Sequence, residues 1–457
     1  MLVFISDLHL TDESAFPAYL SPRAVEAFKK WLFAILERRK EREGGGVEEI
    51  NLVFLGDIFD FIRTDHWWSG VGEEKDNTPW CYKDREGLAQ ELMGVLRKMG
   101  IGSESAARAS EMAKAFREMK RDLKDAGLPV KYTYVVGNHD RVVAQFPKVR
   151  GAVEEALDID ETIEESVLHF FEGYDVVACH GHEFDPNNRV QGDLAPIGDF
   201  IASLSVALPG WIVKKMSEEG FAPEEIQKVE YRLKSLDDVR PCTSLFQWIE
   251  PALRMGDRDK DDLMEKLFRE ITLELVEKLE NSAYLSRWLE AKKCKRILLS
   301  NLKLGRVFSR LAQHPPFFLP ASWVRRVLLS HILPMFLDEG LQPLGRFRRA
   351  WDDIANKSHL DRYARAALQE VSRRKVKAVV MGHTHRADQV CLEAGSFYLN
   401  TGTWRSFFYQ GARSKKQYQP LRRLSAAIVY ASKEGGSRLF EFWDAYMGTT
   451  EEPQLAR

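Results

Sequence analysis

Residues 50–60 read INLVFLGDIFD, an apolar run that ends in a glycine and two aspartates. A short apolar run bounded by glycine and polar residues is typical of a buried strand. The same pattern recurs where LVFI leads to Ser6, YTYVV to Gly137, DVVAC to His180 and AVVM to Gly382. In open α/β sheets, ligands bind just outside the carboxyl ends of the strands. We therefore expect five polar clusters, distant in sequence, to meet in one place.

The polar clusters supply carboxylate, imidazole and amide groups, and no thiolate. They are Ser6-Asp7-Leu8-His9, Gly56-Asp57-Ile58-Phe59-Asp60, Gly137-Asn138-His139-Asp140, His180-Gly181-His182 and Gly382-His383-Thr384-His385. This donor set favours Mn²⁺, Fe or Zn²⁺ over an all-oxygen Ca²⁺ cage or a closed structural zinc site. Each motif alone is weak evidence. Five of them in order, each after an apolar run, predict one site for two metal ions.

The chain divides into three parts by its patterns. Residues 1–186 alternate strand and helix signals, including a helix over residues 24–42, and predict an α/β core with a largely parallel sheet. Amphipathic helical stretches dominate residues 187–370, and strand signals return over residues 371–457. We interpret this as one α/β domain with a long helical insertion.

The stretch 62–83 is polar and irregular but contains Trp67, Trp68 and Trp80. It predicts a loop over the site. The tryptophans could stack a base, line an acyl pocket or pack locally. The sequence leaves these alternatives open.

Composition restricts the partners and the compartment. The chain has 457 residues, 44% of them hydrophobic and 29% charged, with a formal net charge of -2. No global attraction to nucleic acid is implied, so nucleic acid is the less favoured partner. Five dispersed cysteines without a C-x-x-C pair fit a reducing compartment. The first strand signal begins at Leu2 and leaves no room for a signal peptide. We expect a cytoplasmic protein, with peripheral contact at the inner membrane face as an open alternative.

In order, these motifs resemble those of the calcineurin-like metallophosphoesterase superfamily: D-x-H, G-D-x-x-D, G-N-H-D/E, a histidine pair and G-H-x-H. The resemblance covers residues 1–186 and 376–404. It implies a four-layer α-β-β-α sandwich of the metallophosphoesterase type, here interrupted by the helical insertion. It also implies two divalent metal ions, with Mn²⁺ favoured over Fe or Zn²⁺. The implied reaction is hydrolysis of a phosphate ester or pyrophosphate bond by a metal-bridging hydroxide.

The resemblance also implies a role for each residue of these motifs. The first metal would be held by Asp7, His9, Asp57 and His385. The second would be held by Asp57, Asn138, His180 and His383. Asp57 would bridge the two, since its carboxylate has two charged oxygens to share. His139 would assist the leaving group, and Asp60 would orient His139.

The substrate is less closely defined by the sequence. The S-D-L-H-L opening and the H-G-H cluster look like the branch that includes the UDP-diacylglucosamine pyrophosphatases, which suggests a lipid-linked or nucleotide diphosphate. Two departures from that branch are a longer insertion and a histidine at position 139, where an arginine is usual. The alternative is a nucleotide phosphodiesterase or phosphomonoesterase. A non-catalytic scaffold with the same fold is a remote third interpretation.

Further residues are candidate substrate contacts. His182, Arg189 and Arg405 could each bind a phosphate group or stabilise the local structure. Residues 204–216 and 315–351 mix apolar and aromatic residues with basic ones. That mixture suits an interfacial helix or a lipid-chain pocket, although an amphipathic helix packed on the core is the favoured interpretation.

Overall fold

The computed structural model describes residues 1–14, 20–42, 47–103, 107–166, 168–185, 188–190, 194–235, 239–240, 253–291, 358–410, 418–431 and 440–448. These residues form a mixed α/β structure with several sheets, as the alternating signals predict. The stretch 315–351, singled out above for lipid contact, lies outside the described residues.

The larger sheet has seven strands and joins the two ends of the chain. Its first three strands are parallel: β1 (Leu2–Ile5), β2 (Ile50–Leu55) and β7 (Val130–Val135). Its other strands are β10 (Val239–Arg240), β14 (Ser406–Gln410), β15 (Tyr418–Val429) and β16 (Phe440–Gly448). The strand order is β10-β14-β15-β1-β2-β7, and β16 also pairs with β15. Strand β15 runs antiparallel to β1, with Leu2 opposite Val429.

The second sheet has five strands in the order β12-β13-β11-β9-β8. Its strands are β8 (Leu168–Phe171), β9 (Val176–Cys179), β11 (Ala378–Met381), β12 (Ala387–Cys391) and β13 (Phe397–Thr401). The central three, β9, β11 and β13, are parallel. A one-turn helix, η5 (Glu393–Gly395), connects β12 to β13.

Side chains on the inner face of each sheet pack against the other sheet. Side chains on the outer faces are buried under helices. Leu2 and Phe4 of β1 lie in a cluster with Ala178 and Val380 of the second sheet. Alternate side chains point to opposite faces of a strand, and the next residue, Val3, joins the core on the helical side. Burial on both faces explains why the strands are continuously apolar rather than alternating.

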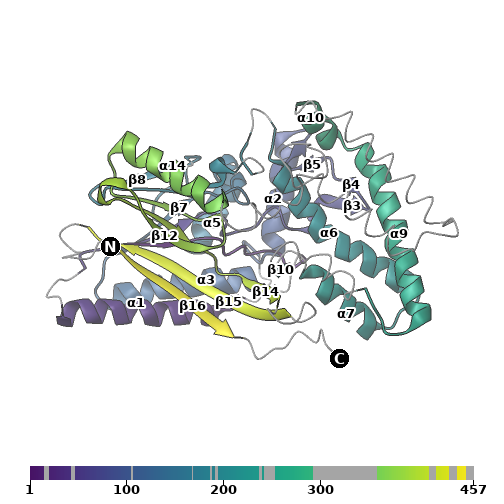
Figure 1. Cartoon of the computed structure of the whole chain (residues 1–457), viewed down its shortest axis with the longest axis horizontal. Coiled ribbons are helices and arrows are strands. Elements are labelled where there is room, and N and C mark those ends of the chain that lie inside the picture. The colour runs from purple at the N-terminus through teal and green to yellow at the C-terminus, as the bar shows by residue number, and fades with distance from the viewer. Residues whose placement is uncertain are drawn as a thin grey trace.

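Helices cover both outer faces of this pair of sheets (Figure 1). The helices packed with the larger sheet are α1 (Pro22–Arg42), α2 (Arg85–Lys98), α3 (Arg108–Asp125), α4 (Val142–Gln145) and α5 (Pro147–Leu157). The helix predicted over residues 24–42 is thus confirmed. On the second sheet, Tyr363 and Ala367 of α14 (Ser358–Arg374) pack against β9 and β11. This helix begins within the predicted insertion and packs on the core.

The remaining helices lie together beside the sheets (Figure 1). They are α6 (Ile197–Glu218), α7 (Pro223–Lys234), α9 (Arg258–Glu280) and α10 (Ala283–Ala291). Ile212, Val229 and Leu267 belong to a separate hydrophobic cluster of this region. Among the described residues, α6 alone is long and apolar enough to cross a membrane by length and composition, and 44% of its apolar window is buried. Buried core helices pass the same test, so α6 is weak evidence for a membrane span.

The stretch 62–83 differs from the predicted loop. It contains the one-turn helix η1 and two small hairpins, formed by strands β3 with β4 and β5 with β6. Their bounds are η1 (Asp65–Trp67), β3 (Trp68–Gly70), β4 (Glu73–Glu74), β5 (Asn77–Thr78) and β6 (Cys81–Tyr82). Trp67, Trp68 and Trp80 are buried, and Trp68 packs on Phe200 and Trp211 of α6. Packing against one another and against α6 therefore accounts for the burial of the three tryptophans.

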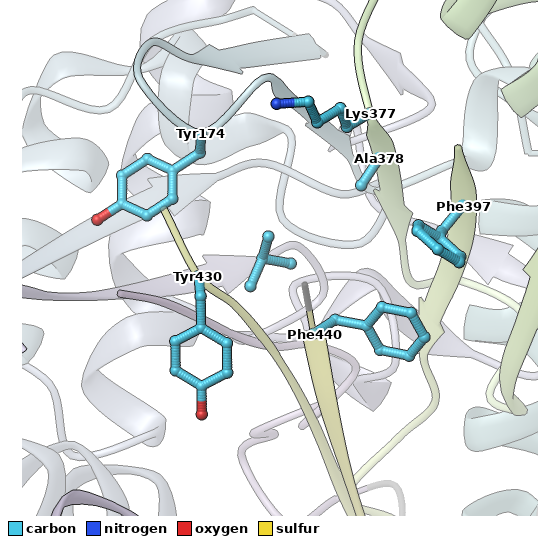
Figure 2. A pocket seen from close by; sticks show the side chains of 7 residues that line it. Tyr174, Lys377, Ala378, Phe397, Tyr430 and Phe440 are labelled. Atoms are coloured by element: carbon cyan, nitrogen blue, oxygen red, sulfur yellow. The ribbon is translucent and has the colours of Figure 1, made fainter. Parts of the chain in front are cut away.

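A small hollow of about 20 Å³ lies between the sheets, near the amino ends of β11 and β13 (Figure 2). Tyr174, Phe397, Tyr430 and Phe440 are among its lining residues. A volume of this size holds about one water molecule. The hollow lies at the opposite end of the parallel strands from the polar clusters, and its size excludes it as a substrate site.

Candidate metal centre

The predicted polar clusters come together at the carboxyl ends of the parallel strands. Three groups of side chains each offer ligand atoms within 4.8 Å of one another. The groups are Asp7 with His9 and His385, then His9 with Asp57 and His139, and finally Asp57 with His180 and His383. The larger sheet contributes the residues after β1, β2 and β7, while the second sheet contributes those after β9 and β11. These buried or half-buried groups are close enough to hold a metal ion.

Asp57 is shared by the second and the third of these groups. Its Oδ2 atom is 3.2 Å from His180 Nε2 and 3.7 Å from His9 Nε2. Its Oδ1 atom accepts a hydrogen bond of 2.9 Å from the backbone N–H of His139. The carboxylate is buried and fixed, and one of its oxygens faces histidines from both sheets.

Asp7 faces the same ring nitrogen of His9 and, more closely, His385. Its Oδ1 atom is 3.1 Å from His385 Nε2 and 3.8 Å from His9 Nε2. The two Nε2 atoms of His9 and His385 are themselves 3.0 Å apart. The second carboxylate oxygen of Asp7, Oδ2, accepts hydrogen bonds from Ser6 Oγ and from the backbone N–H of His383, which is 3.0 Å away. Asp7 Oδ2 thus accepts hydrogen bonds from protein groups, while Asp7 Oδ1 faces the two histidines.

The histidine rings are held by their Nδ1 atoms. His9 Nδ1 lies 2.8 Å from Asp60 Oδ2, and His180 Nδ1 lies 2.9 Å from the Leu55 carbonyl oxygen. A metal-ligating histidine commonly donates its other ring N–H to a carboxylate or carbonyl in this way. The arrangement leaves Nε2 of both rings for a cation.

Three buried polar atoms here have no hydrogen-bond partner: Asp7 Oδ1, Asn138 Oδ1 and His180 Nε2. His180 Nε2 lies 3.2 Å from the Asp57 carboxylate without a hydrogen bond between them. Burying a polar atom without a partner costs roughly 1–3 kcal/mol. All three atoms can donate an electron pair to a metal ion, provided that the His180 ring is neutral. Their lack of hydrogen-bond partners is what a binding site for a cation would show.

The backbone at the site is strained. In the part of the chain that the structure describes, nine non-glycine residues have a positive φ, and five are candidate ligands. They are Asp7, His9, Asp57, His383 and His385, with φ between 48° and 69°. Such conformations cost of order 1–3 kcal/mol each and cluster at functional sites. The strain turns these side chains toward one another immediately after the strands end.

The charges at the site favour carboxylate anions. Burial alone would raise the pKa of Asp57, but His180 and His139 hold it well below its ordinary value. Burial likewise opposes the charge of Asp7, yet His180 and His385 lower its pKa to about 2. Burial lowers the pKa of His9 to about 4, so its ring is neutral at pH 7. The carboxylates Asp57 and Asp7 outweigh burial at His180 and raise its pKa to about 10. A cation at His180 must displace that proton, so metal binding should release protons.

Asp60 has a larger role than the sequence indicates. It was predicted to orient His139, and its Oδ1 atom does lie 2.8 Å from His139 Nδ1. The same carboxylate also holds His9 through Oδ2. Backbone N–H groups of Ile62 and Arg63 donate to Oδ1, at 3.0 and 2.9 Å. Asp60 therefore aligns a candidate metal ligand and the candidate acid together.

The three predicted substrate contacts differ in how far they are buried. His182 is buried, with its ring 5.6 Å from that of His180. Arg189 is exposed, and its backbone N–H donates to the Asp185 carbonyl. Arg405 is half-buried in the segment after β13, where Thr403 Oγ1 donates to the Asp7 carbonyl at 2.8 Å. Whether these three residues contact a substrate stays a prediction.

Asp185, which the sequence places shortly after His182 at the same cleft, lies beside a candidate ligand. Its Oδ2 atom is 3.1 Å from His383 Nε2 and accepts from Asn188 Nδ2 at 2.8 Å. It follows the one-turn helix η2 (His182–Phe184).

Gly137 is required by close packing against Asp57. A Cβ atom at position 137 would lie 2.2 Å from Asp57 Oδ1 and 2.6 Å from its backbone nitrogen. We expect Gly137→Ala to displace Asp57 and to weaken metal binding by about 10-fold or more. Metal titration by isothermal calorimetry measures this. The matched control is Gly151→Ala in α5, where no atom lies within 4 Å, and it should bind metal as the wild type does. Equal affinities for all three proteins would contradict this packing argument.

No model of a known protein family matches the chain, and no curated protein has a matching sequence.

Proposed function

We propose that this protein is a phosphoesterase of the calcineurin-like type that uses two metal ions to hydrolyse a phosphate ester or pyrophosphate bond. The carrying observation is the Asp57 carboxylate, which lies between histidines of two donor groups with the His139–Asp60 pair adjacent. Two facing sheets with helices on both outer sides support this assignment, since the proposed superfamily has a four-layer α-β-β-α fold.

The proposed ligands divide into two sets. Asp7, His9, Asp57 and His385 would hold one cation, and Asp57, Asn138, His180 and His383 the other. Imidazole with carboxylate and amide oxygen suits Mn²⁺, Fe or Zn²⁺, and we favour Mn²⁺. When bound, two such cations would polarise the phosphoryl group and lower the pKa of an attacking water molecule.

The protein's own residues would supply orientation and a proton. Asp60 fixes the ring of His139 through Nδ1. Burial alone would lower the pKa of His139, but the charges of Asp60 and Asp57 raise it above its ordinary value. A protonated imidazole held beside the metal groups can give its proton to the leaving oxygen.

For the substrate, we propose a phosphorylated small molecule, with a lipid-linked or nucleotide diphosphate as the candidate. Nucleotide phosphodiesters or phosphomonoesters are the alternative. We further propose peripheral contact with a membrane surface, with the apolar helix α6 as the candidate element, and a cytoplasmic location at the inner face of that membrane. Liposome co-sedimentation tests this contact, and wild-type protein that stays in the supernatant at low salt would contradict it.

The test of the proposed function combines metal content with turnover. Elemental analysis of purified protein should find Mn, Fe or Zn. Bis(p-nitrophenyl) phosphate or p-nitrophenyl phosphate should be hydrolysed, and a chelator should abolish that hydrolysis. Protein without bound or bindable transition metal and without turnover would instead favour the non-catalytic scaffold.

A further inference from the structure

Arg141 connects the metal centre to the helical region. Its Nη1 atom donates to the backbone carbonyl of Asn138 at 2.7 Å. Its Nη2 atom donates to the Pro79 carbonyl at 3.4 Å and forms an ion pair with Asp199 Oδ2. One guanidinium therefore contacts the loop after β7, the stretch 62–83 and helix α6. Its side chain is only 11% exposed.

Asp199 is the residue of the helical region that pairs with Arg141. It lies in the first turn of α6 and is fully buried. The start of α6 is held by α10, where Tyr284 Oη donates to the Ala195 carbonyl at 2.8 Å and its ring packs on Phe200. A buried carboxylate is costly unless it is paired, so Asp199 and Arg141 hold each other in place.

We infer that Arg141 and Asp199 are positioning residues, through which the helical region at residues 194–291 fixes Asn138 for metal binding. This inference rests on the proposed function, in which Asn138 Oδ1 is a ligand. Asn138 offers a neutral amide oxygen, which attracts a cation less than a carboxylate does. Its contribution depends on being held in place beforehand, and Arg141 holds the backbone of that residue. The guanidinium already binds two carbonyls and a carboxylate. We therefore assign it an indirect role, in which it positions Asn138, rather than direct contact with a metal ion or substrate.

The experiment uses Co²⁺ as the probe on the full-length chain. Chelator competition gives the affinity of each bound Co²⁺, and visible absorption reports its coordination. We expect Asp199→Asn to weaken one Co²⁺ by about 10- to 100-fold and to alter the absorption bands. The other Co²⁺ should keep its affinity, since Arg141 holds the backbone of Asn138, which belongs to the second proposed ligand set alone.

A second variant separates positioning from folding. A buried ion pair can often be replaced by apolar residues without loss of stability. The double variant Arg141→Met/Asp199→Leu should therefore unfold at a temperature near that of the wild type. It lacks the hydrogen bond to the Asn138 carbonyl, so it should show the same selective loss of Co²⁺ affinity.

Ser203→Ala is the matched control on the same helix. It removes the 2.9 Å hydrogen bond from Trp68 Nε1 to Ser203 Oγ, another link between α6 and the stretch 62–83. Wild-type Co²⁺ affinity in this variant is expected.

A loss of Co²⁺ affinity in Ser203→Ala equal to that of Asp199→Asn would overturn the inference, because general docking of α6 would then explain both losses. Unchanged affinity and spectrum in the double variant would also overturn it, while tight Co²⁺ binding by the wild type would leave the proposed function standing. A wild type that binds no Co²⁺ would instead count against the proposed function.

Discussion

Asp57→Asn is expected to remove bound metal from both donor groups and to reduce turnover to background. Asp57 Oδ2 faces His180 at 3.2 Å and His9 at 3.7 Å, so both groups lose the same negative charge. Asparagine has nearly the same shape and can still accept the hydrogen bond from the His139 backbone through its oxygen. The change therefore removes charge while largely preserving packing, and a neutral amide cannot supply two charged oxygens to two cations.

The measurements for Asp57→Asn are metal content after purification and hydrolysis of bis(p-nitrophenyl) phosphate at saturating Mn²⁺. Asp140→Asn is the matched control, since Asp140 is another fully buried aspartate in the same region. Asp140 accepts from the Ile58 backbone N–H and from Tyr134 Oη, so its contacts stabilise the local structure. Asp140→Asn should lower the free energy of unfolding by about 1–3 kcal/mol and keep its metal.

Two results would contradict this role for Asp57. One is an Asp57→Asn protein that retains both metals. The other is equal metal loss in Asp57→Asn and Asp140→Asn, because disruption of the loops would then explain the result without any bridging carboxylate.

Much of the fold was predictable because the strands are apolar without interruption. LVFI and AVVM each bury all four side chains, and a change from apolar to polar residues marks the point where each strand ends. The division into two sheets was not predictable from these runs. Strands buried on both faces have the same composition in either sheet, so nothing in AVVM indicates that it pairs with β9 and β13 rather than with β1. Pairing of β1 with β15 likewise depends on contacts between the two ends of the chain.

The candidate site divides in the same way. Residues that follow a strand directly, such as Asp7 and His383, could be identified because the end of the strand determines their position. Supporting contacts could not be identified, since they depend on tertiary packing. The Leu55 carbonyl that holds His180 carries no sequence signal at all, and Asp199 looks like an ordinary first-turn helix residue. The tryptophans of the stretch 62–83 were ambiguous for a related reason: their burial depends on α6, more than 100 residues later in the chain.

His139→Ala is expected to keep both metals and to lose activity by about 100- to 10,000-fold on a poor leaving group, the usual contribution of a positioned acid. Alanine retains the backbone N–H that donates to Asp57 Oδ1. Asp60 remains satisfied by Ile62 and Arg63 and continues to hold His9. One of the three close groups does include His139, so metal content is a real test: loss of a metal equivalent would make His139 a ligand and contradict its role as an acid.

The leaving group and the pH separate a proton donor from a residue that only shapes the site. A p-nitrophenolate ion leaves without a proton more readily than an alkoxide, so the activity loss in His139→Ala should be smaller for p-nitrophenyl esters than for alkyl esters. The pKa of His139 is raised by Asp60 and Asp57 against burial, and the protonated form is the active one. Activity of the wild type on alkyl esters should therefore fall as the pH rises through a value above the ordinary histidine pKa of about 6.5. This alkaline limb should be absent from the variant, and the pH profile of kcat measures it. A variant with equal losses on both kinds of ester and an unchanged alkaline limb would show that the proton comes from another group.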